Sequence, residues 1–384
     1  MVGYGAPRLT HPANKDRHMA SSAPNAPAPV RLVVMQGDGI GPEISAATLT
    51  VLRALDRMLP LNLVFEEVPI GLAALRSRGT TLPEDSFEKA KAADGVILGP
   101  VSHHDYPPAS QGGINPSGNL RKRLDLFANI RPARSRPGFP PRCGKPIDLV
   151  IVRENTEGFY ADRSMFGGNG EFMPTADLAL SIRKITREGS TRIAEAAFRL
   201  AVRRRSHVTA VHKANVLHVS EGLYLDCVRA IAKNYPQVAY EERIVDAMAA
   251  MLVRDASRFD VIVTTNMFGD ILSDEASEIA GSLGLAESLN AGTDHAVAQA
   301  QHGSAPDIAG KGIANPIAMI ASFGMALRFS LDMAKQADLI DQAIAATLAK
   351  GLRTADIKSD GTKVVTTAQM GDAIIGEMER PAAA

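Results

Sequence analysis

Residues 261–284 read VIVTTNMFGDILSDEASEIAGSLG, an apolar strand pattern followed by a helical one. Residues 261–265 are all β-branched and predict a buried strand, and the helical pattern is expected to begin after the break at residues 266–269. Asp270 and Asp274 are four residues apart, so a helix would carry both carboxylates on one face, about one turn apart. Such a pair is repulsive unless it shares a cation, and its oxygen ligands suit Mg²⁺ or Mn²⁺.

Two acids near the start of a helix also have a simpler explanation. The helix macrodipole favours carboxylates at an N-terminus, and the spacing of Asp270 and Asp274 does not by itself distinguish solvated acids from metal ligands. Their context favours a metal site, because α/β proteins bind ligands where a strand ends and a helix begins.

Length and composition exclude several classes of protein. A chain of 384 residues exceeds one typical core and predicts two domains. The 42 basic and 42 acidic residues give a net charge of zero, which argues against nucleic acid or an anionic membrane as the principal partner. The sequence has no apolar run of membrane-spanning length, and Cys143 and Cys227 cannot form a disulfide framework. We therefore expect a cytoplasmic protein.

The N-terminal residues 1–29 are expected to be a disordered tail. They are rich in Ala, Pro, Ser and Asn and have no apolar periodicity. Met19 is an alternative start of the natural chain, with the preceding residues an extension. An organelle transit peptide is disfavoured, because the basic residues of the tail form no clear amphipathic pattern.

The first ordered stretch carries glycines that resemble a dinucleotide-binding fingerprint. A strand at residues 31–35 runs into QGDGIGPE, residues 36–43, and a helix follows to about residue 59. Counting G-x-G-x-x-G from Gly37 places Pro42 at the last glycine position, so we reject an ordinary Rossmann site. Pro42 instead predicts a tight turn and the first turn of a helix.

Strand and helix patterns alternate over much of the remaining chain and predict an open α/β sheet. The further strands are expected at residues 63–67, 95–99, 148–152 and 208–211, and the helices at residues 83–92, 186–205 and 220–234. Residues 158–180 lack helical periodicity and contain Gly167-Gly168, so we expect an extended arm that reaches a neighbouring subunit.

Several basic residues are candidates for binding or catalysis. Arg121 and Arg131 can bind a carboxylate through the guanidinium fork, although a solvated basic helix would also explain the residues around Arg121. Arg153 belongs to a polar cluster at the end of a strand. Lys213 also follows a strand, where it is either a surface lysine or a catalytic base.

Six blocks of sequence, in order, resemble the β-decarboxylating dehydrogenases of isocitrate, homoisocitrate, 3-isopropylmalate and tartrate. The blocks are GDGIGPE (37–43), LRKRLDLFANIRP (120–132), VRENTEGFY (152–160), HKANVL (212–217), TTNMFGDILSDEASEIAGSLG (264–284) and HGSAPDIAGKGIANP (302–316). The resemblance extends from about residue 31 to the C-terminus. It implies an isopropylmalate dehydrogenase-like two-domain open α/β sheet and not an ordinary Rossmann fold.

This resemblance also implies a domain organisation. Residues 30–126 and 281–384 would form a large α/β domain that binds NAD. Residues 127–280 would form a small domain with the dimer interface and the metal ligands. In this family Lys213 and Asp246 come from the partner subunit, so the resemblance implies a homodimer with shared active sites, or a tetramer built from such dimers.

The resemblance assigns roles to the charged residues of the blocks. The substrate carboxylates would be bound by Arg121, Arg131 and Arg153, Mg²⁺ or Mn²⁺ by Asp246, Asp270 and Asp274, and the protons transferred by Tyr160 and Lys213. Lys213 would accept the hydroxyl proton, directly or through a water or an aspartate, as hydride passes to NAD. Tyr160 would protonate the enolate that decarboxylation leaves.

The resemblance places the adenosine of the cofactor on the HGSAPDIAG block. The residues implied to bind it are Ile40, His302, Gly303, Ser304, Ala305, Pro306, Asp307, Ile308 and Asn315. Asp307 stands where NADP-using members present a lysine. Its carboxylate can accept a hydrogen bond from a ribose 2′-hydroxyl and repels a 2′-phosphate, so we expect NAD.

The sequence indicates less about the substituent on the third carbon of the malate than about the rest of the site. Isopropylmalate enzymes place a Glu and two leucines ahead of Arg121, whereas this chain has Asn115 and Ser117. The polar lining predicts a carboxylate-bearing substituent or none, as in isocitrate, homoisocitrate, malate or tartrate. 3-Isopropylmalate stays an alternative, because Ile114 and residues 103–111 can supply an apolar wall. A non-catalytic regulatory subunit is a second alternative, although the five catalytic and metal residues are all present.

Overall fold

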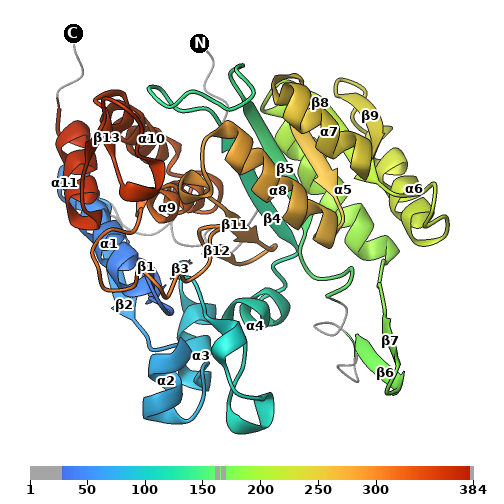
Figure 1. Ribbon diagram of the computed structural model, residues 1–384, viewed down its shortest axis with the longest axis horizontal. Coiled ribbons are helices and arrows are strands. Elements are labelled where there is room, and N and C mark those ends of the chain that lie inside the picture. Colours follow the sequence, from blue (N-terminus) through green and yellow to red (C-terminus); the bar gives the residue numbers. More distant parts are fainter. Residues whose placement is uncertain (1–27, 161–164, 166–169, 381–384) are drawn as a thin grey trace, which may run out of the picture. The chain divides into compact units, whose positions relative to one another are not determined.

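The structure is a computed structural model that describes residues 28–160, 165 and 170–380 (Figure 1). The expected tail, including Met19, lies outside these residues except at its end. The chain divides into two compact units. Unit 1 contains Met1–Leu120, Pro137–Phe139 and Gly284–Ala384, and unit 2 contains Arg121–Arg136 and Pro140–Leu283. Within the described residues no helix is both long enough and apolar enough to cross a membrane.

Unit 1 is built on a mixed sheet whose strands are almost wholly parallel. Their order is β2 (Leu63–Glu67), β1 (Val30–Met35), β3 (Gly95–Leu98), β12 (Ala296–Ala298) and β11 (Leu289–Ala291). The pairs from β2 to β12 are parallel, and β12 and β11 form an antiparallel hairpin. β1 and β3 are apolar and buried over residues 32–35 and 95–98, as a strand covered on both faces requires.

Unit 1 also contains several helices. They are α1 (Gly41–Met58), α2 (Gly71–Arg78), α3 (Glu84–Ala92), α4 (Pro116–Arg123, which ends in unit 2), α9 (Ile317–Phe329), α10 (Ala334–Ala349) and α11 (Thr367–Met378). α9 is buried over residues 317–327 and packs against α1, α10 and β12. Two short strands, β13 (Leu352–Arg353) and β14 (Lys363–Val364), form a separate parallel pair.

The turn between β1 and α1 is joined to the block at residues 302–316. Pro42 lies in the first turn of α1, as predicted. Gly39 has a φ of +57°, and a Cβ at this position would lie 1.9 Å from the backbone oxygen of Ser304. The same oxygen accepts a 2.8 Å hydrogen bond from the backbone N–H of Ile40. The glycines of this turn therefore permit close packing of two backbone segments within unit 1.

Unit 2 also contains a mixed arrangement of parallel and antiparallel strands. Its strands lie in the order β4 (Ala128–Arg134), β5 (Asp148–Glu154), β10 (Val261–Thr264), β8 (His207–His212) and β9 (Ala239–Ile244). β4 and β5 are antiparallel, and the other pairs are parallel. All four residues of β10 are buried, as the sequence predicts. The expectation of an open α/β sheet is thus confirmed in both units.

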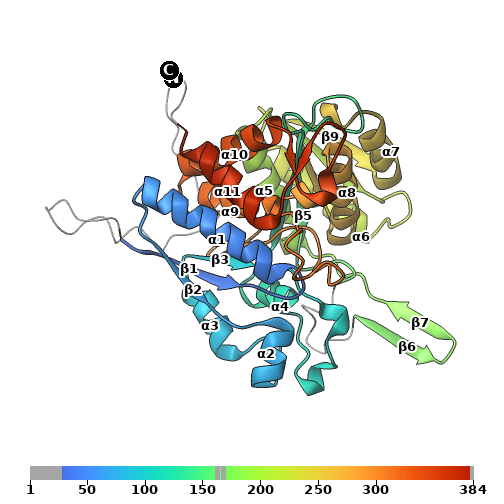
Figure 2. The same cartoon turned by 60° about the vertical axis from the view of Figure 1, so that its left-hand side comes forward.

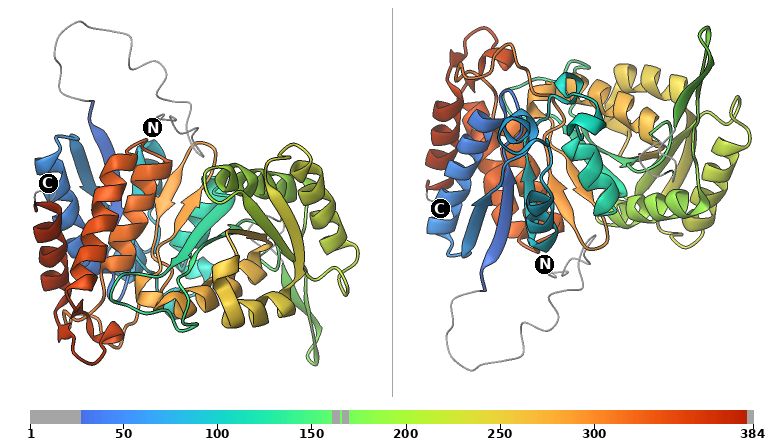
Figure 3. Two further views of the ribbon diagram at one scale, coloured as in Figure 1. Left: turned by 90° about the horizontal axis from the view of Figure 1, so that it is seen from above. Right: turned by 90° about the horizontal axis from the view of Figure 1, so that it is seen from below.

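Helices lie on both faces of the unit 2 sheet (Figure 3). They are α5 (Arg187–Val202), α6 (Ser220–Ala232), α7 (Val245–Asp255) and α8 (Asn266–Ala280). Ile262 of β10 lies in one apolar cluster with Leu252 of α7 and Leu272 of α8. α5 packs on the sheet through β5, β8 and β10 and also contacts α6. The central strand β10 is therefore covered on both faces.

The start of α8 corrects the predicted boundary. We expected helix only after Gly269, but α8 begins at Asn266, directly after the N-cap residue Thr265. The backbone N–H of Gly269 donates a 2.9 Å hydrogen bond to the oxygen of Thr265, so the glycine lies within the first helical turn. Asp270 consequently belongs to the second turn, where the macrodipole is weak. This position removes the simplest explanation for its carboxylate.

The expected arm contains a short hairpin. β6 (Glu171–Thr175) and β7 (Leu178–Ser181) pair in antiparallel fashion, and every residue of both strands is exposed (Figure 2). The exposed side chains include Phe172, Met173 and Leu180. Residues 161–164 and 166–169 of the arm lie outside the described residues. Its contact with a neighbouring subunit stays a prediction.

Candidate active site

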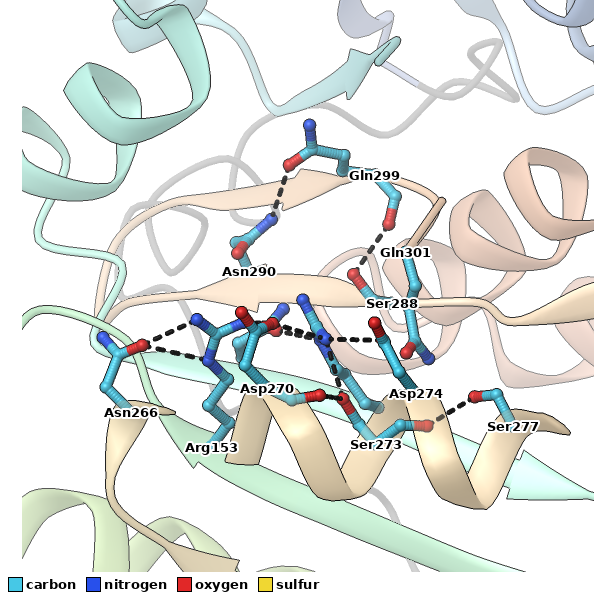
Figure 4. Close-up of polar contacts among 12 residues, drawn as sticks. Arg153, Asn266, Asp270, Ser273, Asp274, Ser277, Ser288, Asn290, Gln299 and Gln301 are labelled. Carbon is cyan, nitrogen blue, oxygen red and sulfur yellow. Dashed lines mark hydrogen bonds and ion pairs between the residues drawn. The ribbon is translucent and has the colours of Figure 1, made fainter. Parts of the chain in front are cut away.

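The carboxylate of Asp270 receives donors from three predicted site residues of unit 2, and Figure 4 shows Asp270 beside one of them, Arg153. Nη1 of Arg131 lies 3.1 Å from Oδ1 of Asp270, and Nη1 of Arg153 donates to the same oxygen. The hydroxyl of Tyr160 donates to Oδ2 at 3.3 Å. Oδ1 of Asp274 lies 3.5 Å from Nη1 of Arg131. The structure thus brings together residues that are far apart in the sequence.

Strand pairing explains how the two arginines meet. Arg153 is the penultimate residue of β5, where it pairs with Asn129 of β4 on one side and Thr264 of β10 on the other. Arg131 lies two residues after Asn129, so its side chain leaves the same face of β4. β10 then runs directly into α8, which carries Asp270. The sheet therefore places two cations against the first turns of one helix.

Arg153 is held by two residues whose role sequence reasoning missed. Its side chain is 2 % exposed, and its Nε and Nη2 donate to Oδ1 of Asn266 at 3.1 and 2.6 Å. A Cβ on Gly269 would lie 2.6 Å from Cγ of Arg153 and 2.7 Å from its Cβ. Only glycine at this position lets the arginine lie directly on α8. No local pattern in the sequence indicates this contact, because the two residues come from different elements.

Arg131 is also buried and depends on polar neighbours. Its side chain is 6 % exposed, its Nη1 donates to the hydroxyl of Ser273 at 2.7 Å, and its Nε donates to Oδ1 of Asn129. Burial, followed by the nearby charge of Arg153, lowers the pKa of Arg131 to about 10. The guanidinium group of Arg131 is therefore still charged at neutral pH. Asp274 supplies a second carboxylate near this pair of cations, since its Oδ1 lies 3.5 Å from Nη1 of Arg131.

The two carboxylates of α8 differ in their electrostatic balance. Burial raises the pKa of Asp270, but Arg153, Arg131 and Arg121 together outweigh burial and hold the pKa below its usual value. Burial raises the pKa of Asp274 above its usual value, and the opposing effect of Arg131 is too weak to reverse this shift. The charge of Asp270 raises the pKa of Asp274 further. A cation beside Asp274 would therefore be stabilising.

Asp270 and Asp274 fit two ligand positions of a Mg²⁺ or Mn²⁺ site. They provide carboxylate oxygens from one face of α8, and Asp274 lacks enough positive charge around it. Among the described residues of one chain, however, no three His, Cys, Asp or Glu side chains are grouped so that they could hold a metal ion. A third protein ligand would have to come from elsewhere.

Lys213 and Asp246 form a separate pair in unit 2. Lys213 follows β8, and its Nζ lies 2.5 Å from Oδ1 of Asp246 in the first turn of α7. The hydrogen bond from Lys213 lowers the pKa of Asp246. Within the described part of one chain, neither residue forms a hydrogen bond or ion pair with Asp270 or Asp274. The structure therefore divides the predicted catalytic and metal residues into two groups.

A buried ion pair lies between these two groups, and sequence reasoning missed it. Glu221 is fully buried and accepts hydrogen bonds from the backbone N–H of Lys213, at 2.8 Å, and from Nη2 of Arg183. Arg183 also donates to the hydroxyl of Thr265, the N-cap residue of α8, at 2.9 Å. The Arg183–Glu221 pair thus ties the end of β8 to the start of α8.

Arg121 lies at the edge of a polar hollow in unit 2. The hollow has a volume of about 350 Å³ and is lined by Arg121, Lys122, Asp125, Asn155, Thr156, Glu157, Lys184, Glu188, Gly189 and Arg192. Arg192 is held there by Asp125 at 2.8 Å, and its guanidinium carbon is 4.6 Å from the centre of the Phe127 ring. Arg121 is near enough to Asp270 to lower the pKa of that carboxyl.

The residues expected to contact the substrate substituent are already hydrogen-bonded within unit 1. Oδ1 of Asn115 accepts a 3.0 Å hydrogen bond from the backbone N–H of Gly118, which satisfies a donor in the first turn of α4. Ser117 is buried, and its hydroxyl donates to Oε1 of Gln299 at 3.0 Å. Sequence reasoning did not identify Gln299, which is 182 residues from Ser117.

The expected adenosine-binding residues lie in and around one loop of unit 1. Ser304 hydrogen-bonds Ser102 through its hydroxyl at 2.8 Å. Asn315 accepts from the backbone N–H of Ile317 at 3.0 Å and donates to Asp356 at 3.1 Å. These contacts fix the amide of Asn315 at the start of α9. The loop is therefore held in place by hydrogen bonds within unit 1.

Two side chains of this loop have polar groups that could bind a ligand. Nε2 of His302 is buried and has no hydrogen-bond partner among the described residues, and burial lowers the pKa of this imidazole. A neutral imidazole nitrogen is suited to an uncharged, hydrogen-bonding ligand such as a base. Asp307 is exposed, and no described residue forms an ion pair with it. Both features fit an adenosine that carries a free ribose 2′-hydroxyl.

The contact between Gly269 and Arg153 can be tested by adding a methyl group. We expect Gly269→Ala to lower the free energy of unfolding by about 1–3 kcal/mol, because the new Cβ overlaps the buried arginine. Gly376→Ala is the matched control, since Gly376 is an exposed residue of α11 with no atom near its Cβ position. The control should be neutral or stabilising by up to about 1 kcal/mol. Equal thermal unfolding midpoints for the two variants would contradict this packing.

Comparisons with known proteins agree with the six blocks. A model of the family described as isocitrate/isopropylmalate dehydrogenase matches residues 31–374. The chain is 41% identical over 360 residues to the 3-isopropylmalate dehydrogenase of Aquifex aeolicus, covering 91% of this chain and 97% of that protein. It is 42% identical over 346 residues to the isocitrate/homoisocitrate dehydrogenase of Thermus thermophilus, covering 90% and 98%.

A solved structure supports the same assignment. The crystal structure of isocitrate dehydrogenase from Methylococcus capsulatus matches with a TM-score of 0.82 and 40% identity, covering 91% of this chain and 99% of that one. The predicted family and fold class are thereby confirmed. Proteins of this family typically use NAD or NADP and a divalent metal ion. The chain belongs to the isocitrate/isopropylmalate dehydrogenase family of β-decarboxylating enzymes that oxidise a CH–OH group.

Proposed function

We propose that this protein is an NAD-dependent, Mg²⁺- or Mn²⁺-dependent enzyme that oxidises and decarboxylates a 3-substituted (R)-malate with a polar substituent, of the isocitrate or homoisocitrate type. The products are a 2-oxo acid, CO₂ and NADH. The observation that carries this proposal is the cluster in which Arg131 and Arg153, both buried, share the single carboxylate of Asp270. With Arg121, which lowers the pKa of Asp270, three guanidinium groups face the carboxylates of Asp270 and Asp274, and a polycarboxylate would neutralise the remaining positive charge.

The substrate carboxylates are assigned to the three arginines. A guanidinium group binds a carboxylate through two parallel hydrogen bonds, and the geometry is most selective where the arginine is held rigidly. Arg153 is held by Asn266, and Arg131 by Asn129 and Ser273. Arg121 is the more accessible member of the set and faces the hollow described above. Such prepositioned cations lose little conformational freedom when a ligand binds.

Asp270 and Asp274 would hold the divalent ion, with Asp246 of the partner subunit as a further ligand. Bound there, the ion would supply charge that favours loss of the substrate hydroxyl proton and stabilises the developing enolate. Asp270 also has a role of its own. Its Oδ2 accepts the hydrogen bond of Tyr160, so the same carboxylate positions the phenol that would act as general acid.

The proton transfers are assigned to Lys213 and Tyr160. Lys213 of the partner subunit would accept the hydroxyl proton as hydride leaves for NAD, and Tyr160 would return a proton to carbon after CO₂ departs. Tyr160 is held by Asp270 and also by Arg153, whose guanidinium carbon is 5.7 Å from the centre of the phenol ring. These contacts restrict the direction in which its hydroxyl can deliver a proton.

A homodimer with shared active sites is supported because, in one chain, the Lys213–Asp246 pair is separate from the cluster around Asp270. Lys213 and Asp246 bond to each other and not to Asp270, so they are available to a neighbouring subunit. Apolar side chains of unit 2 are exposed in the single chain, with Val219 exposed to 88% and Met173 to 62%. Burial of such side chains favours association. A tetramer would need a second interface in addition.

NAD is proposed as the cofactor on the basis of Asp307. Its exposed carboxylate can accept from the ribose hydroxyls, and a 2′-phosphate placed beside it would be repelled. His302 and Asn315 would contact the base. The same loop packs on the turn that contains Ile40, so the backbone of that turn is fixed beside the proposed adenosine site.

3-Isopropylmalate is a second candidate substrate, and one observation favours it. Asn115 and Ser117 already have partners within unit 1, so an apolar substituent would not leave both groups without hydrogen bonds. A buried polar group without a hydrogen bond usually costs about 1–3 kcal/mol of binding free energy, and this cost would then be reduced. The polar character of the two residues still favours a substituent that can hydrogen-bond.

A substrate panel tests the proposed function. We expect kcat/KM with NAD and Mn²⁺ to be higher for isocitrate or homoisocitrate than for 3-isopropylmalate by about tenfold or more, because a polar lining discriminates against an isopropyl group. Malate and tartrate complete the panel. A value for 3-isopropylmalate equal to or above all the others would assign the second candidate. No turnover of any member would indicate a regulatory subunit.

The cofactor assignment is tested by reversing the charge of Asp307. Asp307→Lys should raise the ratio of kcat/KM for NADP to that for NAD, because the 2′-phosphate gains a cation and loses a repelling anion. We expect a change of about tenfold or more. Asp294→Lys is the matched control, since Asp294 is exposed in the turn between β11 and β12. If both variants keep the wild-type ratio, the adenosine site lies elsewhere.

A further inference from the structure

Glu221, in the first turn of α6, is a buried acid that holds the backbone of Lys213. Its side chain is fully buried, and its Oε2 accepts the backbone N–H of Lys213 at 2.8 Å. Lys213 directly follows β8, which ends at His212, and α6 begins at Ser220. The backbone of Lys213 is therefore fixed by a side chain of the helix that follows it. All of these residues belong to unit 2.

The other carboxylate oxygen of Glu221 is occupied by Arg183. Nη2 of Arg183 donates to Oε1 of Glu221, and it also donates to the hydroxyl of Thr265 at 2.9 Å. The Arg183 side chain is 9% exposed, and its guanidinium carbon lies 5.4 Å from the centre of the Phe268 ring of α8. Glu221 thus accepts from two donors, one on each oxygen, and both donors need an acceptor at this position.

A glutamine in place of Glu221 could satisfy only one of these donors. Its amide has the shape of the carboxylate, but an NH₂ group, which donates, replaces one of the two accepting oxygens. The remaining oxygen is expected to face Arg183, because hydrogen bonds from a charged donor are the stronger ones. The NH₂ group would then face the backbone N–H of Lys213, one donor against another. The substitution would therefore displace Lys213 and leave the contact with Arg183 in place.

We propose that Glu221 is a positioning residue for Lys213 and that it acts, through Lys213, in the active site of the partner subunit. This inference rests on the proposed function, in which Lys213 accepts the substrate proton in the partner's site. The Lys213 side chain extends from the backbone that Glu221 holds, and its Nζ lies 2.5 Å from Oδ1 of Asp246. A shift of this backbone would move Nζ, and proton transfer requires that Nζ lie within hydrogen-bond reach of the proton it accepts.

Hybrid dimers with one functional site test this direction of action. One chain carries Lys213→Met and the other carries Tyr160→Phe, each with its own affinity tag, and the hybrid is purified through both tags. The functional site then combines Tyr160 of the Lys213→Met chain with Lys213 of the Tyr160→Phe chain. Glu221→Gln is introduced into either chain in turn. The quantity measured is kcat with NAD, Mn²⁺ and the panel substrate that the wild-type protein turns over fastest.

We expect kcat to be lower by about tenfold or more when Glu221→Gln is in the chain that supplies Lys213 than when it is in the other chain, because a displacement of about 1 Å can cost this much in rate. A purely structural defect would act equally from both chains, since both must fold. Glu221→Asp keeps the charge for Arg183 but shortens the side chain, so it should show the same asymmetry even if Glu221→Gln does not fold. Glu379→Gln, at an exposed position after α11, is the matched control and should show no asymmetry beyond about twofold.

Three outcomes would contradict the inference, and they are distinguishable. Equal kcat values for the two placements of either folded Glu221 variant would overturn the role of Glu221 and leave the proposed function intact. An inactive hybrid without a Glu221 substitution, from an active wild-type protein, would overturn the shared sites and this inference with them. A wild-type protein that turns over no member of the panel would overturn the proposed function itself and the inference that rests on it.

Discussion

The proposed active-site residues of unit 2 are arranged around one carboxylate, which lies between two buried guanidinium groups. The side chains of Arg131 and Arg153 are only 6 % and 2 % exposed, and Asp270 is the acidic residue that contacts both. Two cations that are both removed from water repel each other and lose hydration, so each requires a partner with good geometry. Asp270 meets this requirement and also accepts the hydroxyl of Tyr160. The positions of the proposed substrate, metal and acid groups thus all depend on the placement of α8.

Local backbone features set that placement. β10 is buried between β5 and β8, and Thr265, the residue directly after the strand, is the N-cap residue of α8. Gly269 then allows Arg153 to lie on the helix, and the Arg183–Glu221 pair joins the N-cap residue to the end of β8. Lys213 is bonded to the same glutamate. A single buried ion pair therefore contacts both the strand end that presents the proposed base and the helix that presents the proposed metal ligands.

Sequence patterns predicted the features that are local. The apolar run of β10, the shared face of Asp270 and Asp274, and Pro42 in the first turn of α1 follow from periodicity and residue type over a few positions. β4 was missed as a strand because its arginines interrupt the apolar pattern, although their burial is what the site requires. The partners of the site were also missed. Asn266, Arg183, Glu221 and Gln299 act through contacts with distant residues, and no spacing in the sequence indicates such contacts.

The central claim is that Asp270 and Asp274 bind a divalent ion that is completed by Asp246 of a partner subunit. Mn²⁺ binding, measured by the electron paramagnetic resonance signal of the free ion, tests it without reference to turnover. The account predicts saturable binding by the wild-type protein and weakening by about tenfold or more in both Asp270→Asn and Asp246→Asn, because each substitution removes a charged ligand. The exposed Asp294→Asn should bind as the wild type does. Wild-type affinity in Asp270→Asn would contradict the claim, and wild-type affinity in Asp246→Asn alone would contradict the contribution of the partner.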